Sequence, residues 1–267
     1  MDGFWARSGP ISASETVIMQ RKPLMIMKKQ RPAADHPGFA KGLIFGIPCL
    51  FVFFCVLLKI TADDFYRTMI QEDGLVESLQ AVFFLCASVF ASAAAVRFSG
   101  KKRFIHSVLF YLLSLGLFFI AMEEISWGQR ILRFNLPGFF QKHNVQGELT
   151  IHNLEAIQYH FLIPIYILVG FYGSFAWLVL RRFDSARREA LGWFVPEWFL
   201  VPCFLPLFVI YSYFMIGVYA YWHRIDAFSI GGFVLWRDQE PAEFLMALGF
   251  LLFTLFVRRR QMVGEKK

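Results

Sequence analysis

Acidic side chains open a polar stretch that lies between two apolar runs of this chain. The stretch extends from residue 123 to residue 160 and begins with Glu123 and Glu124. Two neighbouring carboxylates can act as an acid–base pair or bind a cation. Because adjacent residues are about 100° apart on a helix, we expect only one of the two to face a given site.

Histidine and carboxylate side chains later in the stretch have the spacing of metal ligands. His152 and Glu155 are three residues apart, so on a helix they would share one face. Together with His223, from a later loop, they form the predicted ligand set for a divalent metal ion. A histidine at a membrane interface also serves as an amphipathic anchor, and that alternative stays open.

Other polar residues of the same loops are predicted to bind substrate. Arginine suits a phosphate group, although it can equally pair with the surrounding acids. Ser126 followed by Gly128 is half of a nucleophile elbow, but Glu124 stands where the first glycine of that motif belongs. The predicted substrate-binding residues are Ser126, Trp127, Gln129, Arg130, Asn153 and Arg237.

Two further carboxylates, Glu77 and Glu243, lie at the start of other apolar runs. Each closes a similar segment, residues 72–77 and residues 238–243, in which acids precede an apolar helix. Such acids can simply be helix-start signals. Alternatively, an ionisable group that lies within the depth of the membrane is a candidate for a functional site. Glu77 and Glu243 therefore join Glu123 and Glu124 as predicted catalytic residues.

The elements that must position these residues are membrane-spanning helices. Hydrophobic residues make up 57% of the chain, charged residues 18%, and the mean hydropathy is +0.50. Several continuous apolar runs approach the ~20 residues that cross a bilayer as a helix. The sequence predicts an all-α, polytopic membrane protein with about six transmembrane helices, near residues 42–60, 75–96, 104–122, 161–180, 198–218 and 241–257.

The basic residues predict the orientation of these helices. Of the 27 Lys and Arg residues, 20 fall in the two termini and in the turns near residues 97–103 and 181–188. The positive-inside rule then places both termini in the cytoplasm. The net charge of +7 is thus a sign of topology, and we expect no nucleic-acid partner. The polar stretch 123–160 falls on the outer side, and we expect a bacterial inner (plasma) membrane.

The chain divides into three predicted parts. Residues 1–40 form a disordered cytoplasmic tail, residues 41–260 the transmembrane domain, and residues 261–267 a second cytoplasmic tail. Met27 and the basic residues after it resemble the start of a membrane protein, so residues 1–26 could be an extension. All four cysteines lie in the predicted spans, where they serve as small apolar residues.

These features favour a metal-assisted hydrolase or transferase that acts at the outer face on a lipid or lipid-linked substrate. Two alternatives stay open: a transporter or channel, and a non-catalytic membrane assembly or binding protein. Transporters place substrate groups near the bilayer midplane. The middles of the predicted spans contain no Asp, Glu, Lys or Arg, which counts against ion-coupled transport.

Overall fold

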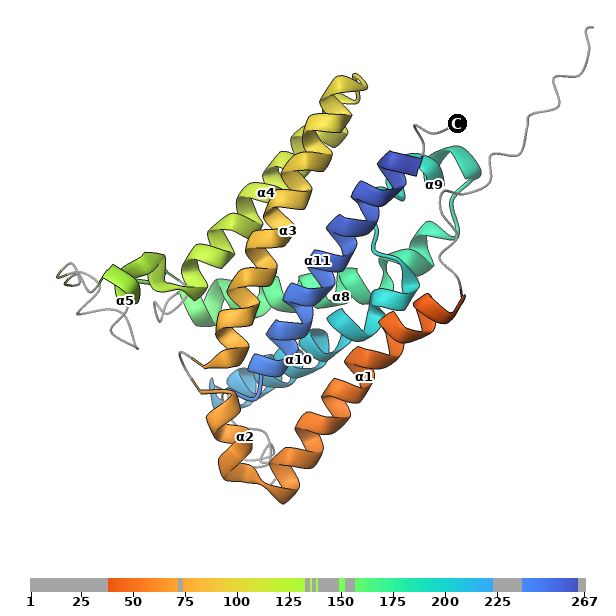
Figure 1. Cartoon of the computed structure of the whole chain (residues 1–267). Helices are drawn as coiled ribbons and strands as arrows, with labels where there is room; N and C mark the ends of the chain where they lie inside the picture. The colour runs from red at the N-terminus through yellow and green to blue at the C-terminus, as the bar shows by residue number, and fades with distance from the viewer. Residues whose placement is uncertain are drawn as a thin grey trace, which may run out of the picture. The chain divides into compact units, whose positions relative to one another are not determined.

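The computed structural model describes residues 38–71, 74–132, 135, 138, 149–151, 157–222 and 237–263. The elements within these ranges are helical, and no strand occurs in them (Figure 1). In chain order they are α1 (Gly38–Thr61), α2 (Asp63–Met69), α3 (Leu75–Gly100), α4 (Phe104–Glu124), η1 (Ser126–Gly128), α5 (Gln129–Leu132), η2 (Gln158–Leu162), α8 (Ile163–Leu180), α9 (Ser185–Leu191), η3 (Trp198–Leu200), α10 (Val201–Trp222) and α11 (Glu240–Val263).

Six helices are long and apolar enough to cross a membrane, as the sequence predicts. They are Gly38–Thr61, Leu75–Gly100, Phe104–Glu124, His160–Leu180, Trp198–Gly217 and Glu240–Val263. The last helix continues beyond the predicted end at residue 257, because Arg258, Arg259 and Arg260 extend it past its apolar part. Arginine is a good helix former outside the membrane core. The side that each terminus occupies stays a prediction.

Helix α3 is the centre of one layer of helices, packed along α4 on one side and α11 on the other (Figure 1). Small side chains let these backbones approach closely, and Ser88 Oγ also donates to Ser114 O of α4 at 2.8 Å. The fully buried alanines of α3 are Ala87, Ala91, Ala94 and Ala95. Small-residue packing thus fixes α3 and α4 as a pair.

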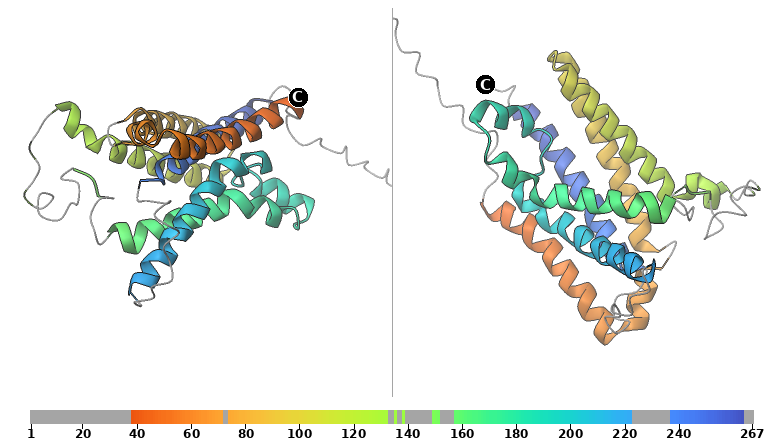
Figure 2. Two further views of the ribbon diagram at one scale, coloured as in Figure 1. Left: turned by 90° about the horizontal axis from the view of Figure 1, so that it is seen from below. Right: turned by 180° about the vertical axis from the view of Figure 1, so that it is seen from behind.

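Helices α8 and α10 pack against each other and lie on one side of the layer formed by α1, α3, α4 and α11 (Figure 2). The ring of Phe204 in α10 joins them to α11. A Cβ added at Gly173 of α8 would lie 2.2 Å from Phe204 Cγ, and one at Gly249 of α11 would lie 2.8 Å from Phe204 Cζ. Only glycine leaves room for this ring, which is 1% exposed.

The short helix α2 folds back on the end of α1 and was not expected from the sequence. Its Tyr66, with Ile70 just after the helix, is buried together with Cys55 of α1. Asp63 and Asp64 occupy its first turn and Arg67 its last turn, which suits the helix dipole. This small cluster orders the segment between α1 and α3.

Candidate functional site

Two carboxylates from different helices meet at one glutamine. Gln80 Nε2 of α3 donates to Glu124 Oε1 at the end of α4 at 2.9 Å, and to Glu243 Oε2 in the first turn of α11 at 3.4 Å. Gln80 is fully buried, Glu243 is 8% exposed and Glu124 is half-buried. Glu124 and Glu243 are called the carboxylate pair below.

Tyrosines of α8 and α10 complete this polar cluster. Tyr211 Oη of α10 donates a hydrogen bond to Glu243 Oε1. The ring of Tyr166 of α8 lies with its centroid 4.5 Å from that of Tyr211. The cluster therefore joins five of the six long helices (α3, α4, α8, α10 and α11), and it links α8 and α10 to the layer that contains α3.

The carboxylate pair lies near one end of the bundle of apolar helices. Helix α4 ends at Glu124, whereas α3 and α11 both begin near this level, at Leu75 and Glu240. Gln80 is five residues into α3, which corresponds to about 7 Å along the helix. The cluster thus lies close to one end of α3, α4 and α11.

An apolar layer closes the cluster toward the middle of the helices. Further into the bundle, four of the five contributing helices carry a buried apolar side chain. These are Phe84 on α3, Leu207 on α10 and Met246 on α11, each one turn from the cluster, and Leu117 on α4, two turns from Glu124. Each of these is at most 2% exposed. The described helices therefore show a polar site at one end and a packed core beneath it.

Gln80 also carries an acceptor that the described residues do not satisfy. Its Oε1 is buried and accepts no hydrogen bond in the described part of the chain. A buried acceptor without a donor is costly, commonly about 1–3 kcal/mol. A substrate hydroxyl, an amine or a water molecule at the carboxylate pair would supply the missing donor.

Glu123 faces away from the carboxylate pair, as its neighbouring position on the helix predicts. It is 4% exposed and accepts from Trp127 Nε1 at 2.5 Å and from the backbone N–H of Ile151 at 2.7 Å. Just after Glu123, the residues Ser126, Trp127 and Gly128 have φ angles of 49°, 52° and 77°, respectively. Two of these are not glycine, so the carboxylate of Glu123 helps to hold an uncommon left-handed turn.

The other predicted substrate-binding residues within the described ranges have contacts of their own. Ser126 is fully buried, and Gln129 Oε1 accepts from the backbone N–H of Leu149 at 2.6 Å. The backbone N–H of Arg237 donates to Gln239 Oε1 at 2.6 Å just before α11. Gln129 and Glu123 thus both anchor residues 149–151, while Arg237 belongs to the start of α11.

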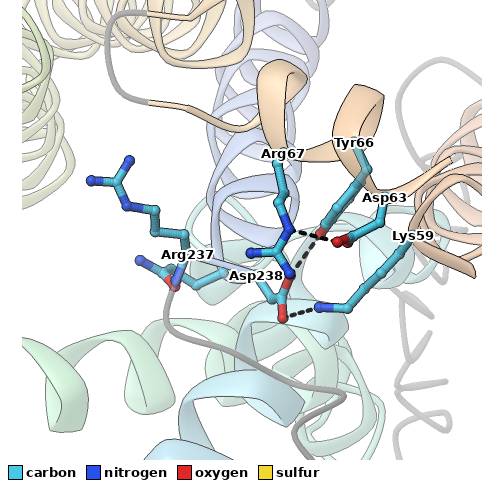
Figure 3. Close-up of polar contacts among 7 residues, drawn as sticks. Lys59, Asp63, Tyr66, Arg67, Arg237 and Asp238 are labelled. Carbon is cyan, nitrogen blue, oxygen red and sulfur yellow. Dashed lines mark hydrogen bonds and ion pairs between the residues drawn. The ribbon is translucent and has the colours of Figure 1, made fainter.

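A second polar cluster ties α1 and α2 to the start of α11 (Figure 3). Asp238 forms an ion pair with Lys59 Nζ and accepts from Tyr66 Oη at 3.1 Å. Arg67 and Asp63 of α2 form a further pair at 2.6 Å on the exposed side. Burial of the Tyr66 phenol, together with the charge and hydrogen bond of Asp238, raises the pKa of Tyr66 well above its ordinary value.

Several predicted site residues lie outside the described residues. These are the predicted ligands His152, Glu155 and His223 and the predicted substrate-binding Asn153; Arg130 is placed only by its backbone in α5. Within the described ranges, no group of three or more His, Cys, Asp or Glu side chains could hold a metal ion. The divalent metal therefore stays a prediction.

Of the four predicted catalytic carboxylates, the structure brings Glu124 and Glu243 together. Glu77 is half-buried in the first turn of α3 and lies close enough to act electrostatically on Glu124. Sequence reasoning missed Gln80, Tyr166 and Tyr211. The signal for Gln80 was its place one turn after Glu77, since residues three apart share a helix face.

Six helices of this length and composition are compatible with an integral, multi-pass membrane protein. No family model, curated protein or solved structure matches the chain. What the protein does must therefore be inferred from the residues of the site.

Proposed function

We propose that this protein is a membrane-embedded enzyme that uses the carboxylate pair for hydrolysis or group transfer on a lipid or lipid-linked substrate. The observation that carries the proposal is the contact of one buried amide, Gln80, with both Glu124 and Glu243. Removing two carboxylates from water has a large free-energy cost, and apolar side chains would hold the helices together at a lower cost. Such a pair is a candidate for acid–base chemistry.

The two carboxylates have different surroundings, which supports different roles. Glu243 accepts hydrogen bonds from Gln80 and Tyr211 and is nearly buried. Glu124 is more exposed, and Gln80 is the one hydrogen-bond partner that the described residues give it. Glu124 is therefore the group that takes a proton from an attacking water or hydroxyl and returns it to the leaving oxygen, while Glu243 positions Gln80.

The site fits a substrate that enters from the membrane surface. The carboxylate pair lies at the end of the bundle opposite the arginine-rich ends of α3, α8 and α11. Under the positive-inside rule this end faces away from the cytoplasm. A lipid-type substrate fits best, because its head group can reach Glu124 while its chains remain beside apolar helices.

Metal assistance is the second part of the proposal and depends on His152, Glu155 and His223. Glu123 and Gln129 anchor residues 149–151, which directly precede His152 in the sequence. The test is the metal content of the detergent-purified protein, measured by elemental mass spectrometry beside His152→Ala. A stoichiometric transition metal that is lost in the variant supports this part, and equal contents contradict it.

The catalytic proposal is tested on lipid extracts from a host strain that lacks the gene. Purified wild type should convert at least one lipid species in the extract, detected by mass spectrometry. Glu124→Gln removes the transferring carboxylate and should lower the rate by about 100-fold or more. Asp64→Asn, an exposed carboxylate change at the same end of the bundle, is the matched control and should convert at the wild-type rate.

Two outcomes would contradict the catalytic proposal. Full conversion by Glu124→Gln would show that the carboxylate pair is not the acid–base group. Absence of any conversion by wild type would favour transport, because Tyr211 lies midway along α10 and extends the cluster toward the bundle interior. Proton uptake into proteoliposomes that contain wild type, and its loss in Glu124→Gln, would then identify a transporter.

A further inference from the structure

A groove lies at the end of the bundle opposite the carboxylate pair, between the α3–α4 turn and α9. Its volume is about 470 Å³, in the usual range of ligand-binding clefts. The residues that line it are Lys102, Arg103, Phe104, Ile105, His106, Ala186, Glu189 and Ala190. It shares no residue with the site proposed above, so the two sites are independent.

The floor of the groove is fixed by His106 of α4. Its Nε2 lies 3.1 Å from the carbonyl oxygen of Ala190, which joins α4 to the end of α9. The imidazole ring also packs between Phe98 and Phe194, with centroid distances of 5.2 and 5.0 Å. The groove is therefore a built feature of the fold.

Two cations line the groove, and neither has an ion-pair partner in the described part of the chain. Lys102 and Arg103 are both exposed, and the guanidinium of Arg103 lies 6.0 Å from the ring centroid of Trp193. Lys102 has φ of +57°, a conformation that favours glycine. A glycine at this position would therefore keep the backbone of the turn. Glu189 is the one carboxylate in the lining and is also exposed.

The apolar wall of the groove continues onto the lipid-facing side of α4. Phe104 is 76% exposed and Ile105 is 69% exposed, at the first two positions of a membrane-spanning helix. Cations at the head-group level beside exposed apolar side chains match a ligand with an anionic head and hydrocarbon chains. Basic pockets between spans are a recurring site for such lipids.

We propose that this groove binds the head group of an anionic phospholipid, with the phosphate at Lys102 and Arg103 and the acyl chains along Phe104 and Ile105. Glu189 opposes the head-group charge and limits the affinity. The lipid joins the α3–α4 turn to α9, so its binding stabilises the folded bundle by an amount that grows with the lipid concentration relative to Kd.

The experiment titrates the purified full chain in a neutral detergent with phosphatidylglycerol and follows the melting temperature. Phosphatidylglycerol should raise Tm, whereas phosphatidylcholine and inorganic phosphate should not. Lys102→Gly removes the charge but suits the backbone at this turn, so the variant should fold and need about fivefold more phosphatidylglycerol for the same shift in Tm. Arg182→Gln, an exposed charge change outside the groove, should respond like wild type.

A variant of opposite sign completes the test. Glu189→Gln removes the opposing carboxylate and should lower the phosphatidylglycerol concentration that gives the same shift in Tm. An equal response of wild type to phosphatidylcholine, the same shift with inorganic phosphate, or an unchanged titration of Lys102→Gly would each overturn the proposal. Absence of any shift with phosphatidylglycerol would overturn it as well.

Discussion

Tyr211 donates a hydrogen bond to Glu243 from the middle of α10 to the first turn of α11. Both residues are buried, with exposed fractions of 4% and 8%. This contact extends the polar cluster at the end of the bundle to α10, where the Tyr211 ring also packs at a tilt against the ring of Tyr166 in α8. The two layers of helices thus meet through a phenol and a carboxylate as well as through apolar packing.

Tyr211→Phe should destabilise the protein, because it leaves a buried oxygen of Glu243 without this donor. The expected loss is about 1–3 kcal/mol in the free energy of unfolding, measured as a lower Tm in detergent. Tyr111→Phe is the matched control, since Tyr111 of α4 is 45% exposed. A double variant, Tyr211→Phe with Glu243→Gln, should lose less than the two single changes added together. Additive losses would contradict the direct contact.

Gly173→Ala should weaken the packing of α8 against α10, because the added methyl would lie 2.2 Å from Phe204 Cγ. Overpacking of this kind costs about 1–3 kcal/mol. Gly116→Ala in α4 is the control, since a Cβ there meets nothing within 4 Å. Thermal unfolding of both variants in the same detergent checks the prediction. A Gly173→Ala protein as stable as Gly116→Ala would show that α8 and α10 do not approach this closely.

Glu123→Ala should release residues 149–151 from the end of α4, because the carboxylate accepts from both Trp127 and Ile151. Hydrogen exchange of a peptide that contains Ile151 should become faster by about tenfold, the effect of losing ~1.4 kcal/mol of local protection. Glu124→Gln, which changes the adjacent carboxylate, should leave this exchange rate unchanged. If both variants exchange at the wild-type rate, Glu123 does not anchor the segment.

The sequence predicted the six long helices because lipid leaves the backbone no alternative to helix, so continuous apolar runs are sufficient. It also predicted that Glu123 and Glu124 face different ways, since this follows from the helix period. The contacts of Gln80 could not be predicted. Glu243 is 163 residues away from it, and their meeting depends on how α3 packs against α11. From the sequence, little distinguishes an uncharged glutamine inside an apolar run as the partner of two carboxylates.

Tyr66 makes the stability of the α1–α2 corner depend on alkaline pH. Burial and the neighbouring Asp238 raise the pKa of Tyr66, whereas an unfolded tyrosine ionises near pH ~10. The folded state therefore keeps a proton that the unfolded state releases. The stabilisation from Tyr66 is fully present below pH ~10 and is lost progressively as the pH rises further. The Tm of wild type should consequently fall more steeply than that of Tyr66→Phe between about pH 9 and about pH 11, while Tyr111→Phe should follow wild type. Parallel curves for wild type and Tyr66→Phe would mean that the phenol is exposed to solvent and does not pair with Asp238.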